Sequence, residues 1–542
     1  MQEAVALYDY IIVGAGTAGC ILAARLTEDP SVRVLLLEAG RDLRSALISI
    51  PAGETLLMGN PRYDWCFETE PDPTLGGRRI PIPRGRLVGG SSAINGMLYV
   101  RGQPADYDAW AAQGSDGWSY ADVAPFFSKL ESYAGPDGRG RGKDGPVCVT
   151  EPRERDRLCD AFLAAASAEG FRQNADYNGA EQEGVGYYQM TQRQGRRWSV
   201  RDGYLSDARR RPNLHLITEA LAMRLELDGK RCVGVKYRQD GQERVARCAI
   251  SVLLCAGVVQ SPQLLELSGI GAPDVLQKAG VPVVHELPGV GENFRDHFAV
   301  RMKWRVRAPI SFNERTRGAR LAGEIVRYAL FRKGVLSFPI ALGYGFIRSS
   351  PAVPGPDIQF HFAPASYGPA SSRRLETRPG MTVGVYPLRP ESSGSIHIST
   401  TDPSQPPAIA PKFLGAQADQ LLLLAGMRVA RRIMDNAQMD QYRDHEIVPG
   451  SAATSDDDLL AFARETGSTS YHPVGTCRMG RDPASVVDQR LRVHGIAGLR
   501  VVDASVMPTM VSGNTHAATL MIGEKAAAMI RADERSRSLG IA

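Results

Sequence analysis

Histidine is the residue type in this chain best suited to move protons near neutral pH, because an unperturbed imidazole titrates near pH 6.5. The nine histidines are His215, His285, His297, His361, His397, His445, His472, His494 and His516. No two of them form the HExxH pattern or the i, i+4 helical pair that zinc sites typically use. The spacing of the histidines therefore gives no support to zinc chemistry, and a proton-transfer role for any of them needs further evidence from the sequence.

A nucleotide-binding turn is predicted near the start of the chain. Residues 8–13 (YDYIIV) predict a buried strand, a GxGxxG pattern and a helix follow, and a second strand over 32–37 ends in an acidic residue. In such a unit the first glycine permits a tight turn, the second lets backbone N–H groups approach a pyrophosphate, and the third lets the helix pack on the strand. The candidate residues are Gly14, Gly16, Thr17, Ala18, Gly19, Glu38 and Ala39, with Glu38 placed to bind an adenosine ribose. This unit alone does not separate NAD from FAD.

Five further segments carry a family resemblance. Residues 85–102 (GRLVGGSSAINGMLYVRG) and 257–271 (GVVQSPQLLELSGIG) resemble the paired signatures of the glucose–methanol–choline (GMC) oxidoreductases, which are FAD flavoproteins. Residues 472–480 (HPVGTCRMG), 501–508 (VVDASVMP) and 513–525 (GNTHAATLMIGEK) resemble the C-terminal part of the same family. The likeness runs in the expected order from Tyr8 to about Ile530 and is strongest to the bacterial choline- and sorbose-dehydrogenase-like branch.

The resemblance implies FAD-dependent oxidation of an alcohol to an aldehyde or ketone, with hydride passing to the flavin N5. His472 falls where the family places its general base, and His516 falls where relatives carry His or Asn as a hydrogen-bonding partner. Choline dehydrogenase-like proteins commonly have Asn there, so this chain departs from them. Asn514 and Thr515 are expected to cap a helix whose positive dipole end keeps His516 neutral. We expect His297 to be structural.

The resemblance also predicts the flavin contacts. Gly89 and Gly90 remove side chains from a loop that a flat ring approaches, and the residues after it, Asn95, Gly96, Met97 and Leu98, are expected to contact the flavin. Some relatives bind FAD covalently through a His just before the matching Asn; here Ile94 stands there, so non-covalent FAD is predicted. A core strand over 252–255 leads to Ala256, near the adenosine part. Asp503, followed by Ala504, would either bind the ribityl or pyrophosphate region or cap the next turn.

The expected fold is α/β (α+β overall), with a Rossmann-like FAD-binding domain interwoven with a second lobe that contains an antiparallel sheet covered by helices. We assign residues 1–153, 203–308 and 457–542 to the FAD-binding domain and residues 154–202 and 309–456 to the substrate-binding domain. Strands are predicted at 358–362, which is expected to be half-buried, and at 382–387 and 395–399, which are expected to be its neighbours in the sheet; a packed helix is predicted at 421–434. Ser261 and Pro262 predict a helix start.

Composition excludes several other classes. The 542 residues are 43% apolar and 23% charged, with a net charge of +5, which is typical of a soluble globular protein. No basic block or basic amphipathic helix stands out, so nucleic acid is not an expected partner. There are eight cysteines without a CxxC pair, no recognisable signal peptide and no bilayer-spanning stretch, which favours a reduced, cytoplasmic protein.

Several alternatives stay open at this stage. A GMC fold also supports a non-redox lyase of the hydroxynitrile type, a fatty-acid photodecarboxylase or an inert flavin-binding protein. The substrate is expected to be a small alcohol, such as a primary alcohol, a polyol or a sugar alcohol. The electron acceptor (oxygen, quinone or another) is undetermined, and so is the choice between dehydrogenase and oxidase.

Overall fold

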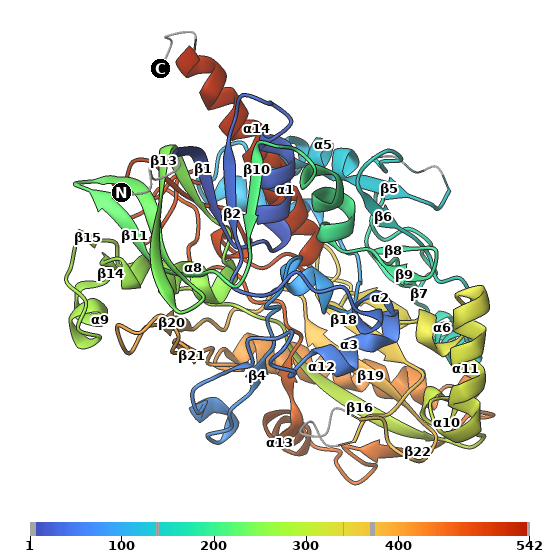
Figure 1. Cartoon of the computed structure of the whole chain (residues 1–542). Helices are drawn as coiled ribbons and strands as arrows, with labels where there is room; N and C mark the ends of the chain where they lie inside the picture. Colours follow the sequence, from blue (N-terminus) through green and yellow to red (C-terminus); the bar gives the residue numbers. More distant parts are fainter. Residues whose placement is uncertain (1–6, 137, 139, 340, 369–373, 539–542) are drawn as a thin grey trace.

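The computed structural model describes residues 7–136, 138, 140–339, 341–368 and 374–538, which form two lobes, each built on a seven-stranded sheet (Figure 1). The first sheet has the order β10-β2-β1-β13-β12-β11, with β24 paired to β13. Its strands β1, β2, β10, β13 and β24 pair in parallel, while β11 and β12 are antiparallel. The bounds are β1 Leu7–Val13, β2 Val34–Leu37, β10 Leu214–Ile217, β11 Leu221–Asp228, β12 Arg231–Gln239, β13 Gln242–Leu254 and β24 Leu499–Val501.

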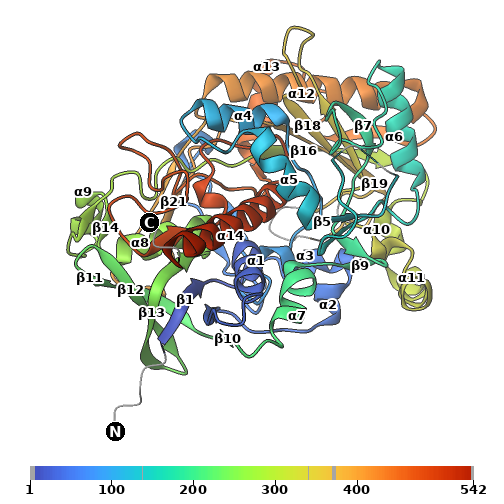
Figure 2. The same cartoon turned by 90° about the horizontal axis from the view of Figure 1, so that it is seen from above.

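The predicted nucleotide-binding unit is confirmed as a strand–turn–helix–strand in the centre of this sheet. The apolar run of β1 is almost wholly buried because parallel strands are covered on both faces. Helix α1 (Thr17–Leu26) begins directly after the glycine turn and packs beside α14 (His516–Ser538), as the view from above shows (Figure 2). A side chain at Gly523 would lie 3.0 Å from Ile21 Cδ1, so a glycine allows these two helices to cross closely.

The second sheet has the order β22-β16-β19-β18-β17-β7, with β23 (Ser468–Thr469) paired to β16, and is antiparallel. Helix α12 (Gln417–Asp435) packs on β18 and β19, and α6 (Arg157–Ala168) packs beside α12. Strand β18 was expected to be half-buried, but it is nearly all buried because α12 covers it. The bounds are β7 Gly184–Tyr187, β16 Phe298–Val306, β17 Gly343–Ile347, β18 Ile358–Ala363, β19 Gly380–Pro387 and β22 Arg443–Val448.

Three details differ from the sequence-based predictions. Strand β16 lies in the second sheet, although residues 203–308 were assigned to the first domain. Strand β20 (Ser395–His397) pairs with β21 (Ala408–Ala410) in a separate ribbon rather than with β18 or β19. Helix α8 spans Gly257–Leu267, so Pro262 lies inside it; the carbonyl of Val258, which proline cannot bond, instead accepts the Thr476 hydroxyl at 2.6 Å.

The sequence analysis did not predict the amphipathic helix α11 (Gly318–Phe331), which lies at the outer edge of the second lobe (Figure 1).

Shorter elements complete the lobes. They are α2 Ala46–Ser49, α3 Glu54–Leu57, β3 Phe67–Glu68, β4 Pro81–Ile82, α4 Pro104–Ala112, α5 Tyr120–Leu130, β5 Glu131–Tyr133, β6 Val147–Val149, β8 Gln192–Arg193, β9 Arg196–Arg197, α7 Ser206–Ala208, β14 Ile270–Gly271, α9 Pro273–Lys278, β15 His285–Glu286, α10 Phe312–Arg315, α13 Asp456–Thr466 and β23 Ser468–Thr469.

Candidate active site

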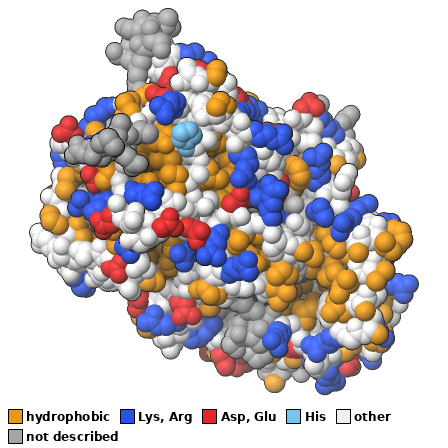
Figure 3. All heavy atoms as spheres, in the orientation of Figure 1, with side chains coloured by type: hydrophobic (Ala, Val, Ile, Leu, Met, Phe, Trp, Pro, Cys, Tyr) orange, Lys and Arg blue, Asp and Glu red, His pale blue; other side chains and the backbone are white. Residues whose placement is uncertain are grey.

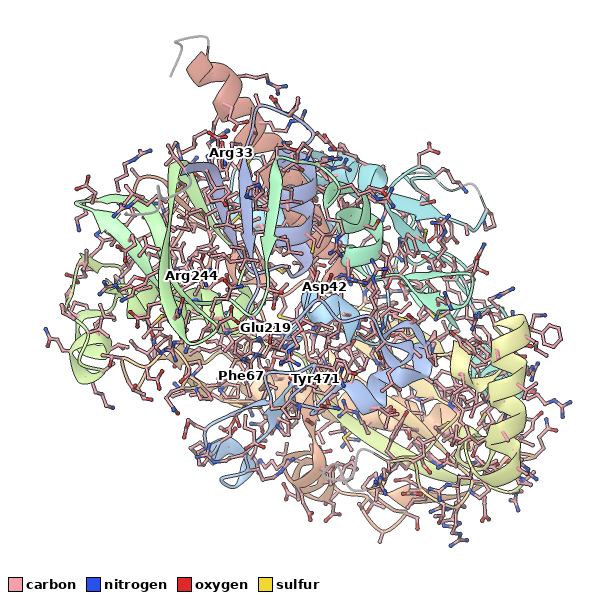
Figure 4. All side chains as sticks on the ribbon, in the orientation of Figure 1. Arg33, Asp42, Phe67, Glu219, Arg244 and Tyr471 are labelled. Carbon is pink, nitrogen blue, oxygen red and sulfur yellow. The ribbon has the colours of Figure 1, made fainter. Side chains whose placement is uncertain are left out.

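A cavity of about 730 Å³ is lined by residues of both sheets. It runs from the glycine turn after β1 to the second sheet, where His361 of β18 and Tyr386 of β19 line it. Figure 4 labels Tyr471, the neighbour of His472, in the region where the two lobes meet. The predicted site residues that line this cavity are Gly14, Gly16, Thr17, Ala18, Glu38, Ala39, Gly90, Asn95, Gly96, Met97, Leu98, Ala256, His472, Asp503, Ala504 and His516.

The three glycines of the turn differ in the space around them. Gly14 has a φ of +102°, and a side chain on it would meet the carbonyl oxygen of Cys255 at 2.5 Å. A side chain on Gly19 would lie 1.9 Å from the carbonyl oxygen of Gly14, so only glycine lets α1 pack this closely on the turn. Gly16, by contrast, has no neighbour nearer than 4.0 Å to such a side chain, and its backbone is left open to the cavity.

The second glycine pair closes the loop onto this turn. A side chain on Gly90, whose φ is +52°, would lie 2.7 Å from Gly16 Cα. Gly89 and Gly19 are not among the residues that line the cavity; the N–H of Gly89 donates to the carbonyl of Ala15 at 2.8 Å. The two loops therefore form one wall, with Gly90 as their contact.

Glu38 is held at the carboxyl end of β2 by two backbone groups. Its Oε2 accepts the N–H of Ala15 at 2.9 Å and its Oε1 accepts the N–H of Gly40 at 2.8 Å. Burial raises the pKa of this carboxyl to about 7, against the opposing effect of the two N–H donors. Each oxygen retains a second lone pair, so the carboxyl can still accept ribose hydroxyls, as its predicted role requires.

Asp503 caps the short turn that follows β24, which is one of the two roles that the sequence left open. Its Oδ1 accepts the N–H of Ser505 at 2.8 Å, and its Oδ2 accepts the N–H of Gly257 at 2.9 Å and the hydroxyl of Ser261 at 2.6 Å. These bonds tie the turn to the start of α8. Burial raises the pKa of the Asp503 carboxyl.

Both ring nitrogens of His472 have hydrogen-bond partners. Its Nδ1 lies 3.0 Å from Nδ1 of His297, and its Nε2 lies 2.8 Å from the amide nitrogen of Asn514. The other ring nitrogen of His297, Nε2, lies 2.8 Å from the carbonyl oxygen of Leu388. A chain of hydrogen bonds thus runs from the second lobe through two imidazoles to the cavity.

The partners at the two ends of this chain fix where the protons are. A carbonyl only accepts, so His297 must donate from Nε2 to Leu388. Burial lowers the pKa of His297 to about 4, so at neutral pH its Nδ1 is unprotonated and accepts from Nδ1 of His472. Burial, followed by the neighbouring His297, lowers the pKa of His472 well below its usual range. His472 is therefore neutral, with its lone pair on Nε2, where the amide of Asn514 donates.

His516 lies at the first residue of α14, near the helix N-terminus as predicted, and it lines the same cavity. In the part of the chain that the structure describes, neither of its buried ring nitrogens has a hydrogen-bond partner. Burial, followed by the positive charge of Arg197, lowers the pKa of His516 to about 4. The observed partner of His472 is Asn514, which we had expected only to cap the helix, and His516 is left with two ring nitrogens for a ligand.

The sequence reasoning missed two site residues, His297 and Asn514, and also the residue that holds the catalytic segment in place. The carboxylate of Asp296 accepts the backbone N–H of His472 at 2.9 Å and the hydroxyl of Thr469. Burial raises the pKa of Asp296 to about 6. The adjacent Asp-His pair at 296 and 297 was the available signal, since one residue fixes the backbone of His472 and the next fixes its ring.

These features define a class: a protein with a Rossmann-type nucleotide site joined by one cavity to a neutral, oriented imidazole. Comparison with known proteins gives the family, since models described as GMC oxidoreductase match residues 8–299 and 390–523. This chain belongs to the GMC oxidoreductase family.

Individual relatives agree with this assignment. The chain is 43% identical to an alcohol dehydrogenase [acceptor] of Pseudomonas putida, over 97% of this chain and 96% of that protein. It is 41% identical to the mitochondrial choline dehydrogenase of Homo sapiens, over 97% and 90% of the two chains. A solved structure that addresses FAD modification in an Aspergillus oryzae formate oxidase variant matches with a TM-score of 0.91 at 26% identity, over 98% of this chain and all of that one. The fold is therefore that of FAD-binding flavoproteins, with a Rossmann-like domain and a second sheet lobe.

Proposed function

We propose that this protein oxidises an alcohol at a non-covalently bound FAD, with His472 as the general base. The observation that carries the proposal is the proton arrangement at His472, which presents an unprotonated Nε2 at the cavity wall. The similarity to alcohol and choline dehydrogenases supports the reaction class, and no observation favours a lyase.

The residues present fit FAD. Gly14, Gly16 and the start of α1 would hold the pyrophosphate, Glu38 the ribose, and the segment from Asn95 to Leu98 the flavin. The two unpartnered nitrogens of His516 support a ligand with hydrogen-bonding groups in this part of the cavity. Ile94, which lines the cavity, has no nucleophilic atom, and this supports non-covalent binding. The bound flavin would supply the two-electron acceptor for hydride from the alcohol carbon.

The chain's own groups handle the proton. Nε2 of His472 would accept the hydroxyl proton of the substrate, whose hydroxyl would replace the amide of Asn514 as the donor to that atom. Such general-base assistance is worth about 10²–10⁴-fold in rate. As Nε2 takes the proton, Nδ1–H of His472 continues to donate to His297, so the ring does not turn. Asn514 and His516 would then hold the substrate oxygen in line.

The cavity is lined by charges of both signs, since the carboxylates of Glu54 and Glu465 line it together with arginine and lysine side chains, and we base our preference for an uncharged alcohol on the cations of β16. Arg301 and Lys303 of β16 line the cavity, and a fixed quaternary ammonium near them would be repelled. Lys303 is partly compensated by Glu376, at 3.5 Å, whereas Arg301 bonds only the carbonyl of Thr469 among the contacts described. We propose a primary alcohol, a polyol or a sugar alcohol as substrate, with oxygen, a quinone or another acceptor reoxidising the flavin.

The deciding experiment is anaerobic mixing of the yellow holoenzyme with a panel of alcohols that includes choline. Flavin bleaching by an uncharged alcohol is expected, followed by reoxidation with oxygen, quinone or dye. A protein purified without flavin, or a flavin that no alcohol bleaches, would refute the proposal; bleaching by choline alone would refute the substrate class.

Two further features belong to this proposal. We assign residues 1–153, 203–308 and 457–542, without β16, to the FAD-binding domain and residues 154–202 and 309–456, with β16, to the substrate-binding domain.

A cytoplasmic location is supported by eight free thiols, of which Cys66 is exposed. Within the described ranges, no helix is both long and apolar enough to cross a bilayer.

A further inference from the structure

Helix α11 is amphipathic, but its apolar side faces outward. Its side chains that point into the protein are polar: the carboxylate of Glu324 binds Arg315 at 2.7 Å and accepts the N–H of Val335, and the hydroxyl of Tyr328 donates to the carbonyl of Gly195 at 3.0 Å. These two residues are the only ones of α11 that are buried. A helix that packs on its own fold normally does the opposite.

The outward face carries large apolar side chains. Exposed fractions are 51% for Ile325, 56% for Val326, 69% for Leu330 and 62% for Phe331. With 3.6 residues per turn, Ala322, Ile325, Val326 and Ala329 share one stripe, which Leu330 widens. Figure 3 shows hydrophobic side chains gathered over α11 at the right-hand edge of the molecule, with basic side chains around them. Large apolar faces of this kind mark a docking surface.

The rim of this face is basic. Residues 315–333 contain six basic side chains and one acidic one; the buried acid, Glu324, pairs with Arg315, and Arg327 pairs with Glu154. Lys333 and Arg320 are exposed at opposite ends of the helix, and within the part of the chain that the structure describes Arg320 contacts a backbone carbonyl at 3.5 Å and forms no ion pair. An apolar stripe between cationic side chains suits a bilayer with anionic headgroups, because the stripe enters the acyl boundary while the cations remain at the phosphates.

We propose that α11 docks this protein on the surface of a membrane that contains anionic lipid. A second copy of the chain fits less well, because a two-fold contact through this face would bring two basic rims together. The helix is 14 residues long, about 21 Å, which is enough to lie in the interface plane but not to span it. The proposal is independent of the reaction at the flavin.

Vesicle flotation of the holoenzyme tests it. Wild-type protein is expected to float with vesicles of phosphatidylcholine and phosphatidylglycerol and to bind them less at high salt. With vesicles of phosphatidylcholine alone it should remain in the bottom fraction. The variant Leu330→Ser/Phe331→Ser should lower binding by roughly tenfold or more. Arg320→Gln/Lys333→Gln should lower it on anionic vesicles.

The matched control is Leu421→Ser, because Leu421 lies on α12 and is similarly exposed, at 58%, but lies outside this face. It should float like wild type, and every variant should keep its flavin and its rate of reduction by alcohol in solution, which separates this test from that of the reaction. The proposal is overturned if wild-type protein fails to float with anionic vesicles or if the Leu330/Phe331 variant floats as well as the control. It is also overturned if light scattering shows that the wild-type protein is a dimer and that, among the variants, only Leu330→Ser/Phe331→Ser is a monomer.

Discussion

The hydrogen bond between His297 and His472 can be tested by replacing one ring nitrogen at a time. Asparagine places an amide atom near the position of the imidazole Nδ1, whereas glutamine places one near Nε2. His297→Asn should therefore keep an acceptor for Nδ1–H of His472 and lose the donor to Leu388. His297→Gln should keep that donor and lose the acceptor.

The expected effect follows from burial. His297 is fully buried and His472 nearly so, and a buried N–H left without an acceptor costs about 1–3 kcal/mol. If that cost falls on the base-competent tautomer, the proton transfer slows by about 5- to 150-fold. The slowing cannot exceed that caused by complete loss of the general base, which is about 10²–10⁴-fold. His297→Gln should fall in the first range, and His297→Asn should stay within a few-fold of wild type.

The assay is stopped-flow reduction of the flavin under anaerobic conditions over a range of alcohol concentrations. If the variant disfavours the His472 tautomer that carries its proton on Nδ1, the limiting rate of flavin reduction should fall. The alcohol concentration that gives half of this rate should stay unchanged. Thermal unfolding of both variants, and of His445→Gln at an exposed histidine, controls for stability. Equal limiting rates for the Asn and Gln variants would refute the reasoning, whether both are fast or both are slow.

The remaining predictions concern the base, its neighbours and the glycine loop. His472→Gln should slow flavin reduction by about 10²–10⁴-fold while the protein stays yellow, which absorbance and stopped flow measure together. Because burial holds the pKa of His472 below its usual range, the neutral base is the form present above that pKa; the limiting rate should stay level as pH falls to 6.5 and decline only at lower pH, and a decline centred near pH 7 would contradict this. His516→Asn, which retains one donor and one acceptor, should reduce the rate less than His516→Ala, as the same assay will show. Gly90→Ala would place a methyl group 2.7 Å from Gly16 Cα, at a residue whose φ is positive. Flavin content, measured by absorbance, should therefore fall, and the free energy of unfolding should fall by about 1–3 kcal/mol.

Local patterns predicted the strand–turn–helix–strand unit at the start of the chain, for physical reasons. The role of Gly19 depends on its contact with Gly14 in the same strand–turn–helix unit, so the spacing of these two glycines carries that part of the geometry. The close approach of Gly14 to the carbonyl of Cys255, which follows β13, could not be read from this spacing. Asp503 shows the limit of such reasoning. Its carboxylate bonds both its own turn and the distant Gly257 and Ser261, and only the first of these can be anticipated from neighbours in sequence.

The proton-handling half of the site could be predicted only in part. Its partners lie far apart in the chain, since His297 and His472 are separated by 175 residues, and nothing in the local sequence of either specifies the other. Family resemblance led us to expect His472 as the general base and His516 as a second imidazole bonding the same substrate oxygen, and we gave Asn514 only the role of a helix cap. In the structure His516 and Asn514 both line the cavity, and it is Asn514 that bonds the ring. Helix α11 was overlooked because its apolar spacing is ordinary; only the contacts of Glu324 and Tyr328 show which side faces outward.

The connectivity of the base has a mechanical consequence. His297 directly precedes β16, Leu388 directly follows β19, and these two strands pair in the second sheet. The segment that carries His472 is fixed to the same sheet, because β23 pairs with β16 and Asp296 binds the backbone of His472. The nucleotide turn, by contrast, is built entirely on the first sheet. His472 therefore lies at the junction of the two lobes, in a segment that we assign to the FAD-binding domain but that is also fixed to the second sheet. The distance between its Nε2 and a bound flavin then depends on how rigidly the lobes meet. Contacts that fix the His472 segment to the first lobe, such as that of Thr476 with Val258 of α8, should then affect the rate of alcohol oxidation although they lie outside the hydrogen-bonded chain of the base.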